Sequence, residues 1–137
     1  MQKMIFVNFP VEGLVKSTEF YKAVGFTLNP VDSDSNASCM VWSDSIFVML
    51  LKQDFFKKFI ATKQIVDAHN SSEVLLGLAI ESKEEVDNFV KKALDCGGKL
   101  MPVAEIAGDE GMYFRDVEDL DGHIWEFGYT EPTAKLS

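Results

Sequence analysis

The stretch that decides the fold is Phe9–Tyr21, FPVEGLVKSTEFY, which joins the end of a strand to the start of a helix. The run Met4–Phe9 before it is apolar and favours a strand, and Pro10 is typical of a strand end. Gly25 stands where a helix cap belongs. Four residues between these points recur at helical spacing: Leu14, Ser17, Tyr21 and Val24. The sequence therefore opens with a strand followed by a helix.

Three further strands are predicted after this helix. They cover residues 26–31, 37–42 and 46–51, with a polar turn cluster at 32–36 and a tight turn at Asp44-Ser45. A connecting helix is expected over Gln53–Thr62, and the polar stretch 63–72 is the best candidate for a linker.

The second half repeats this order of elements. A strand at 73–80 precedes a capping box, Ser82 to Glu85, in which the serine hydroxyl accepts from a free helix amide. Strands are expected at 99–105, 112–117 and 123–129, and Asp121-Gly122 is a strong hairpin signal. The helix between them carries an apolar stripe for packing on a sheet: Val86, Phe89, Val90, Ala93 and Leu94.

The two copies also correspond residue by residue at a few positions. Val11 and Phe20 of the first copy match Ile80 and Phe89 of the second. The same order of elements twice is a fold-level signal. We therefore predict an α+β chain of two βαβββ modules in one domain, 1–137. Its parts are a first repeat at about 1–52, a linker with a helix at about 53–72, and a second repeat at about 73–130.

Composition narrows the function classes. The chain has 137 residues and a net charge of -9, so a surface for nucleic acid or for an anionic membrane is not expected. The N-terminus has no apolar signal segment, and no apolar run is long enough to span a bilayer. Cys39 and Cys96 form no CxxC pair and suit a reducing compartment. A cytoplasmic location is expected.

Three segments resemble the vicinal oxygen chelate superfamily, which includes glyoxalase I, bleomycin-resistance proteins and extradiol dioxygenases. Phe9–Tyr21 is similar to the opening pattern V-x-D-L-x-x-S-x-x-F-Y. Gly25-Phe26 matches the G-F/M that follows the first helix of the family. Asp119–Glu126, DLDGHIWE, looks like the closing hairpin D-P-D-G-x-x-x-E. The resemblance covers nearly the whole chain.

The resemblance implies an architecture and a place for a ligand. Each βαβββ module wraps its sheet round a cup, two modules form an open, cup-shaped mixed β-sheet barrel, and the ligand sits in the cup. Many members are dimers, so a homodimer is expected. A shared fold does not establish a shared function, so the function has to be inferred from the residues of the site itself.

The family's four metal-ligand positions can be carried over to this chain. They fall on Phe6, approximately Met49, Leu75 and Glu126, and only Glu126 has a donor for a hard divalent ion. We therefore predict no metal site of the family type and no cofactor. An off-pattern site of His123, Glu126 and His69 stays open as an alternative.

Glu126 is the lone acid in an otherwise apolar strand, where a carboxylate loses hydration and needs a partner. It is a candidate for ligand recognition or for general-base catalysis, and equally for a structural acid paired inside the protein. Arg115, the only arginine, suits a carboxylate or phosphate on a ligand. A structural pairing of Arg115 with Glu126 or Asp116 is the favoured alternative.

The remaining cup residues follow from strand alternation and the resemblance. The acids from Asp116 to Asp121 are interpreted as mostly solvated hairpin charges. Asn8 and Tyr113 each offer one polar contact, with ordinary sheet polarity as the alternative. The full set of candidate ligand-binding residues is Phe6, Asn8, Met49, Leu75, Gly77, Ala79, Tyr113, Arg115 and Glu126.

Two function classes follow, with a third behind them. The first is a metal-independent binding protein for a small apolar or aromatic molecule, for which the bleomycin-resistance proteins, which sequester their ligand, are the closest example. The second is a divergent lyase, isomerase or dioxygenase with Glu126 as base or with a metal at an unexpected position. The third is a dimeric scaffold with a vestigial cup.

Overall fold

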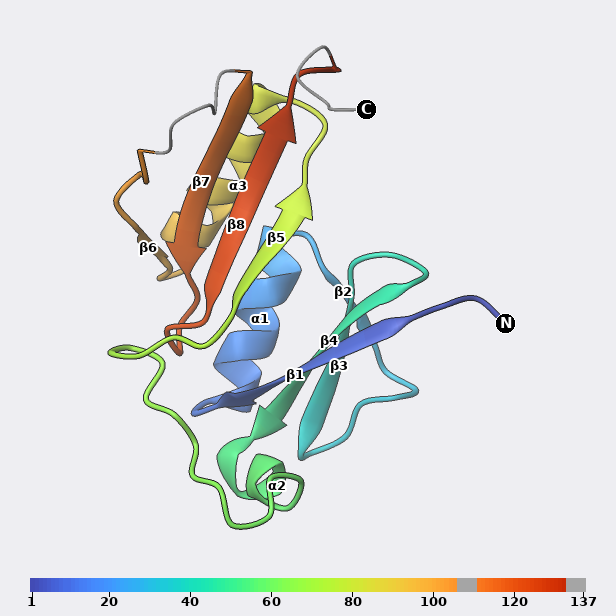
Figure 1. Cartoon of the computed structure of the whole chain (residues 1–137). Coiled ribbons are helices and arrows are strands. Elements are labelled where there is room, and N and C mark those ends of the chain that lie inside the picture. Colours follow the sequence, from blue (N-terminus) through green and yellow to red (C-terminus); the bar gives the residue numbers. More distant parts are fainter. Residues whose placement is uncertain (106–110, 133–137) are drawn as a thin grey trace. The chain divides into compact units, whose positions relative to one another are not determined.

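A computed structural model describes residues 1–105 and 111–132 of the chain, which divides into two units, Met1–Asp67 and Ala68–Ser137. Each unit carries one sheet of four strands and one main helix (Figure 1). The boundary lies inside the polar stretch predicted as the linker.

In unit 1 the first strand, β1 (Ile5–Val11), is followed by helix α1 (Leu14–Val24). The backbone at Gly25 has φ 130°, a value that an L side chain rarely adopts, and α1 ends there. The other strands are β2 (Thr27–Asn29), β3 (Ala37–Val41) and β4 (Ile46–Lys52). The sheet order is β1-β4-β3-β2, with β1 parallel to β4 and the other pairs antiparallel.

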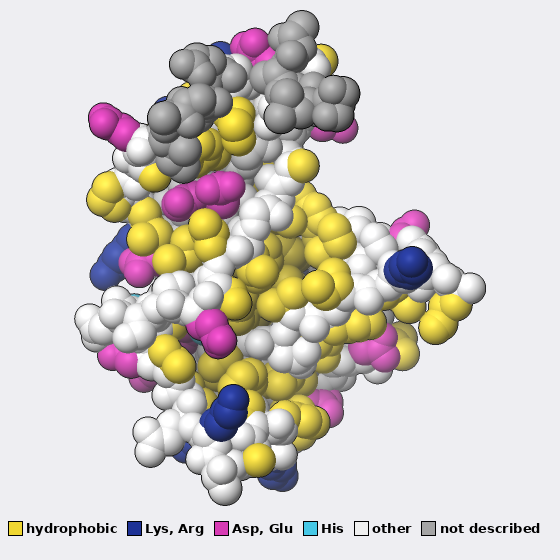
Figure 2. Space-filling model, viewed as in Figure 1, with side chains coloured by type: hydrophobic (Ala, Val, Ile, Leu, Met, Phe, Trp, Pro, Cys, Tyr) yellow, Lys and Arg dark blue, Asp and Glu magenta, His cyan; other side chains and the backbone are white. Residues whose placement is uncertain are grey.

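The core of unit 1 lies between this sheet and α1. From the helix come the buried side chains of Phe20, Tyr21 and Val24. The sheet contributes five more that are all but removed from solvent: Phe9, Val11, Met40, Val48 and Leu50. Alternation along the strands leaves the intervening residues on the other face, where Phe6 is 49% exposed. Apolar side chains are accordingly visible along β1 in the space-filling view (Figure 2).

Unit 2 repeats the pattern with β5 (Leu75–Ala79), α3 (Lys83–Asp95), β6 (Lys99–Leu100), β7 (Met112–Glu118) and β8 (Ile124–Thr130). Its sheet order is β5-β8-β7-β6, again with one parallel pair, β5 and β8. The amide of Glu85 donates to Ser82 Oγ at 3.1 Å, so the predicted capping box begins α3. Buried Val86, Val90 and Ala93 pack on the sheet.

Four predicted elements are shorter than expected. Strand β2 covers Thr27–Asn29 in place of 26–31, and β5 covers Leu75–Ala79 in place of 73–80. The differences are larger at α2 and β6. Helix α2 (Gln53–Lys57) stops before Thr62 because the chain tightens into i to i+3 turns, Lys58 N to Phe55 O among them, and Ala61 then takes a positive φ of 55°. Strand β6 ends early because its pairing stops at the Met101 amide, which donates to Asp116 O, and Pro102 has no amide hydrogen to continue the ladder.

The predicted fold class, α+β with two βαβββ modules, is confirmed, and both sheets are mixed and open. The longest helix, α3, has 13 residues. Within 1–105 and 111–132 no helix combines the length and the apolar character that a bilayer crossing needs.

The hairpin turn at Gly122 yields a test of the fold of unit 2. Gly122 has φ 90°, and a Cβ added there would lie 2.7 Å from the backbone of Ala68 and His69. Gly122→Ala should therefore lower the free energy of unfolding by about 2 kcal/mol or more, measured by urea denaturation.

Gly13→Ala is the control, since φ is -121° there and the nearest contact of the added methyl is 3.8 Å away. Gly13→Ala should lower the free energy of unfolding by no more than about 1 kcal/mol. Equal losses in the two variants would contradict the close approach of residues 68–69 to the hairpin.

Candidate functional site

Strand β8 places Glu126 at the centre of the unit 2 sheet. Its neighbours in β8, Trp125 and Phe127, are 4% and 2% exposed and face α3, where Phe127 stacks on Phe89 with ring centroids 5.3 Å apart. Alternation turns Glu126 to the opposite, open face. There it lies between Asp116 on β7 and Gly77 on β5, its cross-strand partners.

The floor beside the Glu126 carboxyl is made of small residues. Gly77 and Ala79 on β5 are exposed, and Gly128 continues the same face on β8. A Cβ built on Gly77 would lie 3.7 Å from Glu126 Oε1, so the missing side chain leaves that oxygen accessible. A strand glycine often marks a place where another molecule approaches closely. Leu75, 51% exposed, borders this floor.

Glu126 and Asp116 form a carboxyl pair. Partial burial raises the pKa of Glu126, and the charge of Asp116 and a hydrogen bond with it raise that pKa further. Burial also raises the pKa of Asp116, while the hydrogen bond from Glu126 opposes this rise. Two carboxyls in contact cannot both ionise readily, so the pair holds one shared proton over part of the pH range.

One oxygen of this pair is left without a partner. Asp116 Oδ1 is buried and accepts no hydrogen bond from any described residue. Such an oxygen is unusual, because buried polar atoms in folded proteins nearly always have a partner. The pair therefore has hydrogen-bonding capacity that the described residues do not use.

The interpretation of Asp116 as a solvated hairpin charge is wrong. Asp116 is partly buried and pairs with Glu126. The same interpretation is wrong for Asp119, which is 4% exposed and whose Oδ1 accepts from the amides of Asp121 and His123. The sequence does contain a signal for the pairing of Asp116 with Glu126. These two residues are equally far along the chain from Asp121, which lies in the predicted hairpin turn. Residues equally far from a hairpin turn face each other across the two strands.

Arg115 does not make the expected pairing with Glu126 or Asp116. Its guanidinium carbon lies 4.1 Å from the centre of the Tyr113 ring, and Nη1 donates to Phe114 O at 2.7 Å. The Tyr113 hydroxyl donates to Asp87 Oδ1 on α3 at 2.6 Å. Arg115 and Tyr113 thus occupy the helix-facing side of the sheet, because each is an odd number of residues from Asp116.

The other predicted residues form a separate group on unit 1. Asn8 is the register partner of Met49, and Phe6 that of Phe47, with the two phenyl rings stacked at 4.5 Å. The Asn8 side-chain amide donates to Phe6 O at 3.2 Å. This group lies on the face of the sheet away from α1. The structure therefore brings Leu75, Gly77, Ala79 and Glu126 together on unit 2, and Phe6, Asn8 and Met49 together on unit 1.

The donor chemistry at the family's metal positions does not fit a divalent ion of the usual kind. Phe6, Met49 and Leu75 offer no hard donor, and the acid paired with Glu126 across the strands is Asp116. No group of three or more His, Cys, Asp or Glu residues suited to a metal occurs within 1–105 and 111–132. His123 does not join such a group, and its amide donates to Asp119 Oδ1.

Comparison with known proteins gives a fold-level result. No family model matches the chain, and no curated protein matches it significantly. A hypothetical protein, SA1046 from S. aureus, is 28% identical with a TM-score of 0.75, over 94% of each chain.

Two further solved structures carry informative descriptions. A glyoxalase/bleomycin resistance protein/dioxygenase family enzyme from Burkholderia phytofirmans PsJN is 18% identical over 94% of this chain and 99% of its own, with a TM-score of 0.73. The fosfomycin resistance protein FosX from Listeria monocytogenes, solved with Mn(II) and sulfate, is 16% identical over 99% and 96%, with a TM-score of 0.69. The chain thus shares the fold of these glyoxalase/bleomycin resistance/dioxygenase proteins, which is the fold that its opening and closing motifs predicted.

Proposed function

We propose that the open face of β5, β7 and β8 binds a small apolar or aromatic molecule that carries a cation or a hydrogen-bond donor. We also propose that it does so without the metal site of the superfamily. The observation that supports the proposal most strongly is the carboxyl pair of Glu126 and Asp116 beside the uncovered floor at Gly77.

The carboxyl pair supports a positively charged or donor group in the ligand. An ammonium group would favour the ionised form of both acids and would supply hydrogen bonds to a pair that now shares one proton. An anionic ligand would meet repulsion at the same place. The direct route for such a group is over Gly77, which has no side chain of its own beside Glu126 Oε1.

The surroundings of the pair support an apolar body for the ligand. Leu75 and its register partner Ile124 flank one side of the pair, and Ala79 and Gly128 flank the other. Burial of apolar surface there would supply most of the affinity, and the carboxyl pair would fix the orientation. The contributions of Phe6, Asn8 and Met49 on unit 1 stay predictions, as do those of Tyr113 and Arg115.

A second candidate function is a divergent enzyme of the superfamily, a lyase, isomerase or dioxygenase. The raised pKa of Glu126 favours it, because a carboxyl whose pKa lies above its ordinary value holds a proton more readily and is better suited to donate or accept one. Turnover by wild-type protein that is lost in Glu126→Gln would support this function. Binding without turnover would support the first.

Metal analysis tests the metal-independent part of the proposal. Protein purified without chelators should contain far less than one transition ion per chain, measured by mass spectrometry of the digested protein, because three of the four family positions lack donors. Stoichiometric nickel, zinc, iron or manganese would contradict the proposal.

Ligand binding tests the role of Glu126. Benzylamine should raise the melting temperature of the wild-type protein by mass action, whereas benzyl alcohol, its neutral analogue, should raise it much less. Glu126→Gln should remove most of the benzylamine shift, and Glu73→Gln, at an exposed acid outside the sheet, should retain it. An undiminished shift in Glu126→Gln would show that the ligand is bound elsewhere.

The pH dependence of stability tests the carboxyl pair in the unliganded protein. The folded-state pKa of Glu126 is raised, so the stability linked to its proton is fully present below its ordinary pKa of 4.5. That stability is lost as the pH rises through the raised value. Glu126→Gln carries no such proton, so it should lose less stability than the wild type between about pH 4 and about pH 8, measured by urea denaturation.

The control is again Glu73→Gln, which should follow the wild-type profile. A Glu126→Gln profile parallel to that of the wild type would contradict the shared proton.

A further inference from the structure

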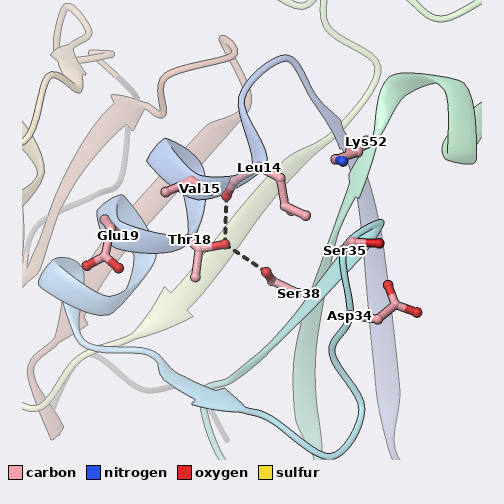
Figure 3. A pocket seen from close by; sticks show the side chains of 8 residues that line it. All are labelled: Leu14, Val15, Thr18, Glu19, Asp34, Ser35, Ser38 and Lys52. Carbon is pink, nitrogen blue, oxygen red and sulfur yellow. Dashed lines mark hydrogen bonds between the residues drawn. The ribbon is translucent and has the colours of Figure 1, made fainter.

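A pocket of about 420 Å³ lies in unit 1, on the α1 side of the sheet. Its size is within the range of sites for small molecules. It opens between the first turns of α1, the loop before β3 and the end of β4 (Figure 3). The lining residues are Leu14, Val15, Thr18, Glu19, Asp34, Ser35, Ser38 and Lys52. None of them belongs to the site proposed above.

The loop wall of the pocket is preformed. Asp34 Oδ1 accepts from the amides of Asn36 at 2.8 Å and Ala37 at 3.1 Å, and the Asp34 amide donates to Ala37 O at 2.9 Å. The amide of Lys52 donates to Asn36 O at 3.0 Å, which ties the loop to the end of β4. A ligand would therefore meet a wall that needs little ordering.

The innermost polar atoms of the pocket can only accept hydrogen bonds. Thr18 Oγ1 lies 2.7 Å from Leu14 O and 2.7 Å from Ser38 Oγ. The carbonyl has no proton, so the single Thr18 proton goes to Leu14 O and Ser38 donates to Thr18. Both hydroxyl protons are committed in this way, and the lone pairs of Ser38 Oγ are available to a donor.

Side chains of both charges line the pocket. Lys52 supplies a cation on the β4 side (Figure 3). Asp34 adds a carboxylate at the margin, and Glu19 adds another that pairs with Lys22 at 3.6 Å. Leu14 and the 77% exposed Val15 provide apolar surface between the polar groups.

We propose that this pocket binds a small zwitterionic amino acid with an apolar side chain. The ammonium group donates to Ser38 and lies in the field of Asp34, the carboxylate pairs with Lys52, and the alkyl chain covers Leu14 and Val15. A zwitterion suits three features of the pocket together. These are the hydroxyl oxygens that can only accept hydrogen bonds, the one lysine among the lining residues, and the carboxylate at the margin. An amine lacks the partner for Lys52, and a simple carboxylate lacks the donor for Ser38.

The test compares three probes by chemical shifts of backbone amides in ¹⁵N-labelled full-length protein. Norleucine should shift the amides of Leu14, Thr18 and Ser38 in a saturable way, with a Kd on the order of 1 mM. Pentylamine, which lacks the carboxylate, and hexanoate, which lacks the ammonium group, should bind at least about threefold more weakly. Equal binding of the three probes, or no shift at these residues, would overturn the proposal.

Two variants assign the charges without disturbing the core. Lys52→Gln should weaken norleucine about threefold or more and leave pentylamine unchanged, because Lys52 is exposed and contacts only the carboxylate. Lys57→Gln, at another exposed lysine of unit 1, should bind norleucine as the wild type does. Equal norleucine affinity in Lys52→Gln and Lys57→Gln would overturn the proposal. Glu126→Gln should leave norleucine binding intact, so failure here is distinct from failure of the site on unit 2.

Discussion

The candidate site depends on one cross-strand contact, the pairing of Asp116 on β7 with Glu126 on β8. Opposed side chains in an antiparallel pair have Cβ atoms about 5 Å apart, so two acids at these positions cannot avoid each other. The register is fixed by the turn at Asp119–His123 and by the apolar residues Val117, Trp125 and Phe127 on the helix side. A slip of β8 by one residue would turn Glu126 toward α3 and away from Asp116.

The same contact explains the chemistry of the open face. Acids that repel each other while partly buried retain a proton or attract a cation, and either outcome lowers their mutual repulsion. Gly77 adds access, because its missing side chain leaves Glu126 Oε1 uncovered. A carboxyl pair beside an open floor suits ligand recognition better than a fully enclosed ion pair would.

Much of the fold is predictable from the sequence, because local signals and the apolar pattern agree. The glycine after α1, the capping box at Ser82 and the Asp121-Gly122 turn each fix one boundary. The largest differences are at α2 and β6, where Ala61 and Pro102 end elements that composition alone would extend. Within the candidate site, Glu126 can be predicted from the sequence, because it is the lone acid in an apolar strand. Asp116 is harder to recognise, because it is one of several acids beside the hairpin turn. Arg115 points away from Asp116 and Glu126 because strand alternation places it on the helix side.

The most direct test of the account is a carboxyl ¹³C NMR titration of the wild-type protein. The Glu126 and Asp116 resonances should titrate as a coupled pair, with at least one step above the ordinary range of these acids. In Asp116→Asn the pKa of Glu126 should move down toward its ordinary value of 4.5, because the repelling charge is gone. Two independent titrations at ordinary pKa values, unchanged by Asp116→Asn, would contradict the shared proton on which the proposed site depends.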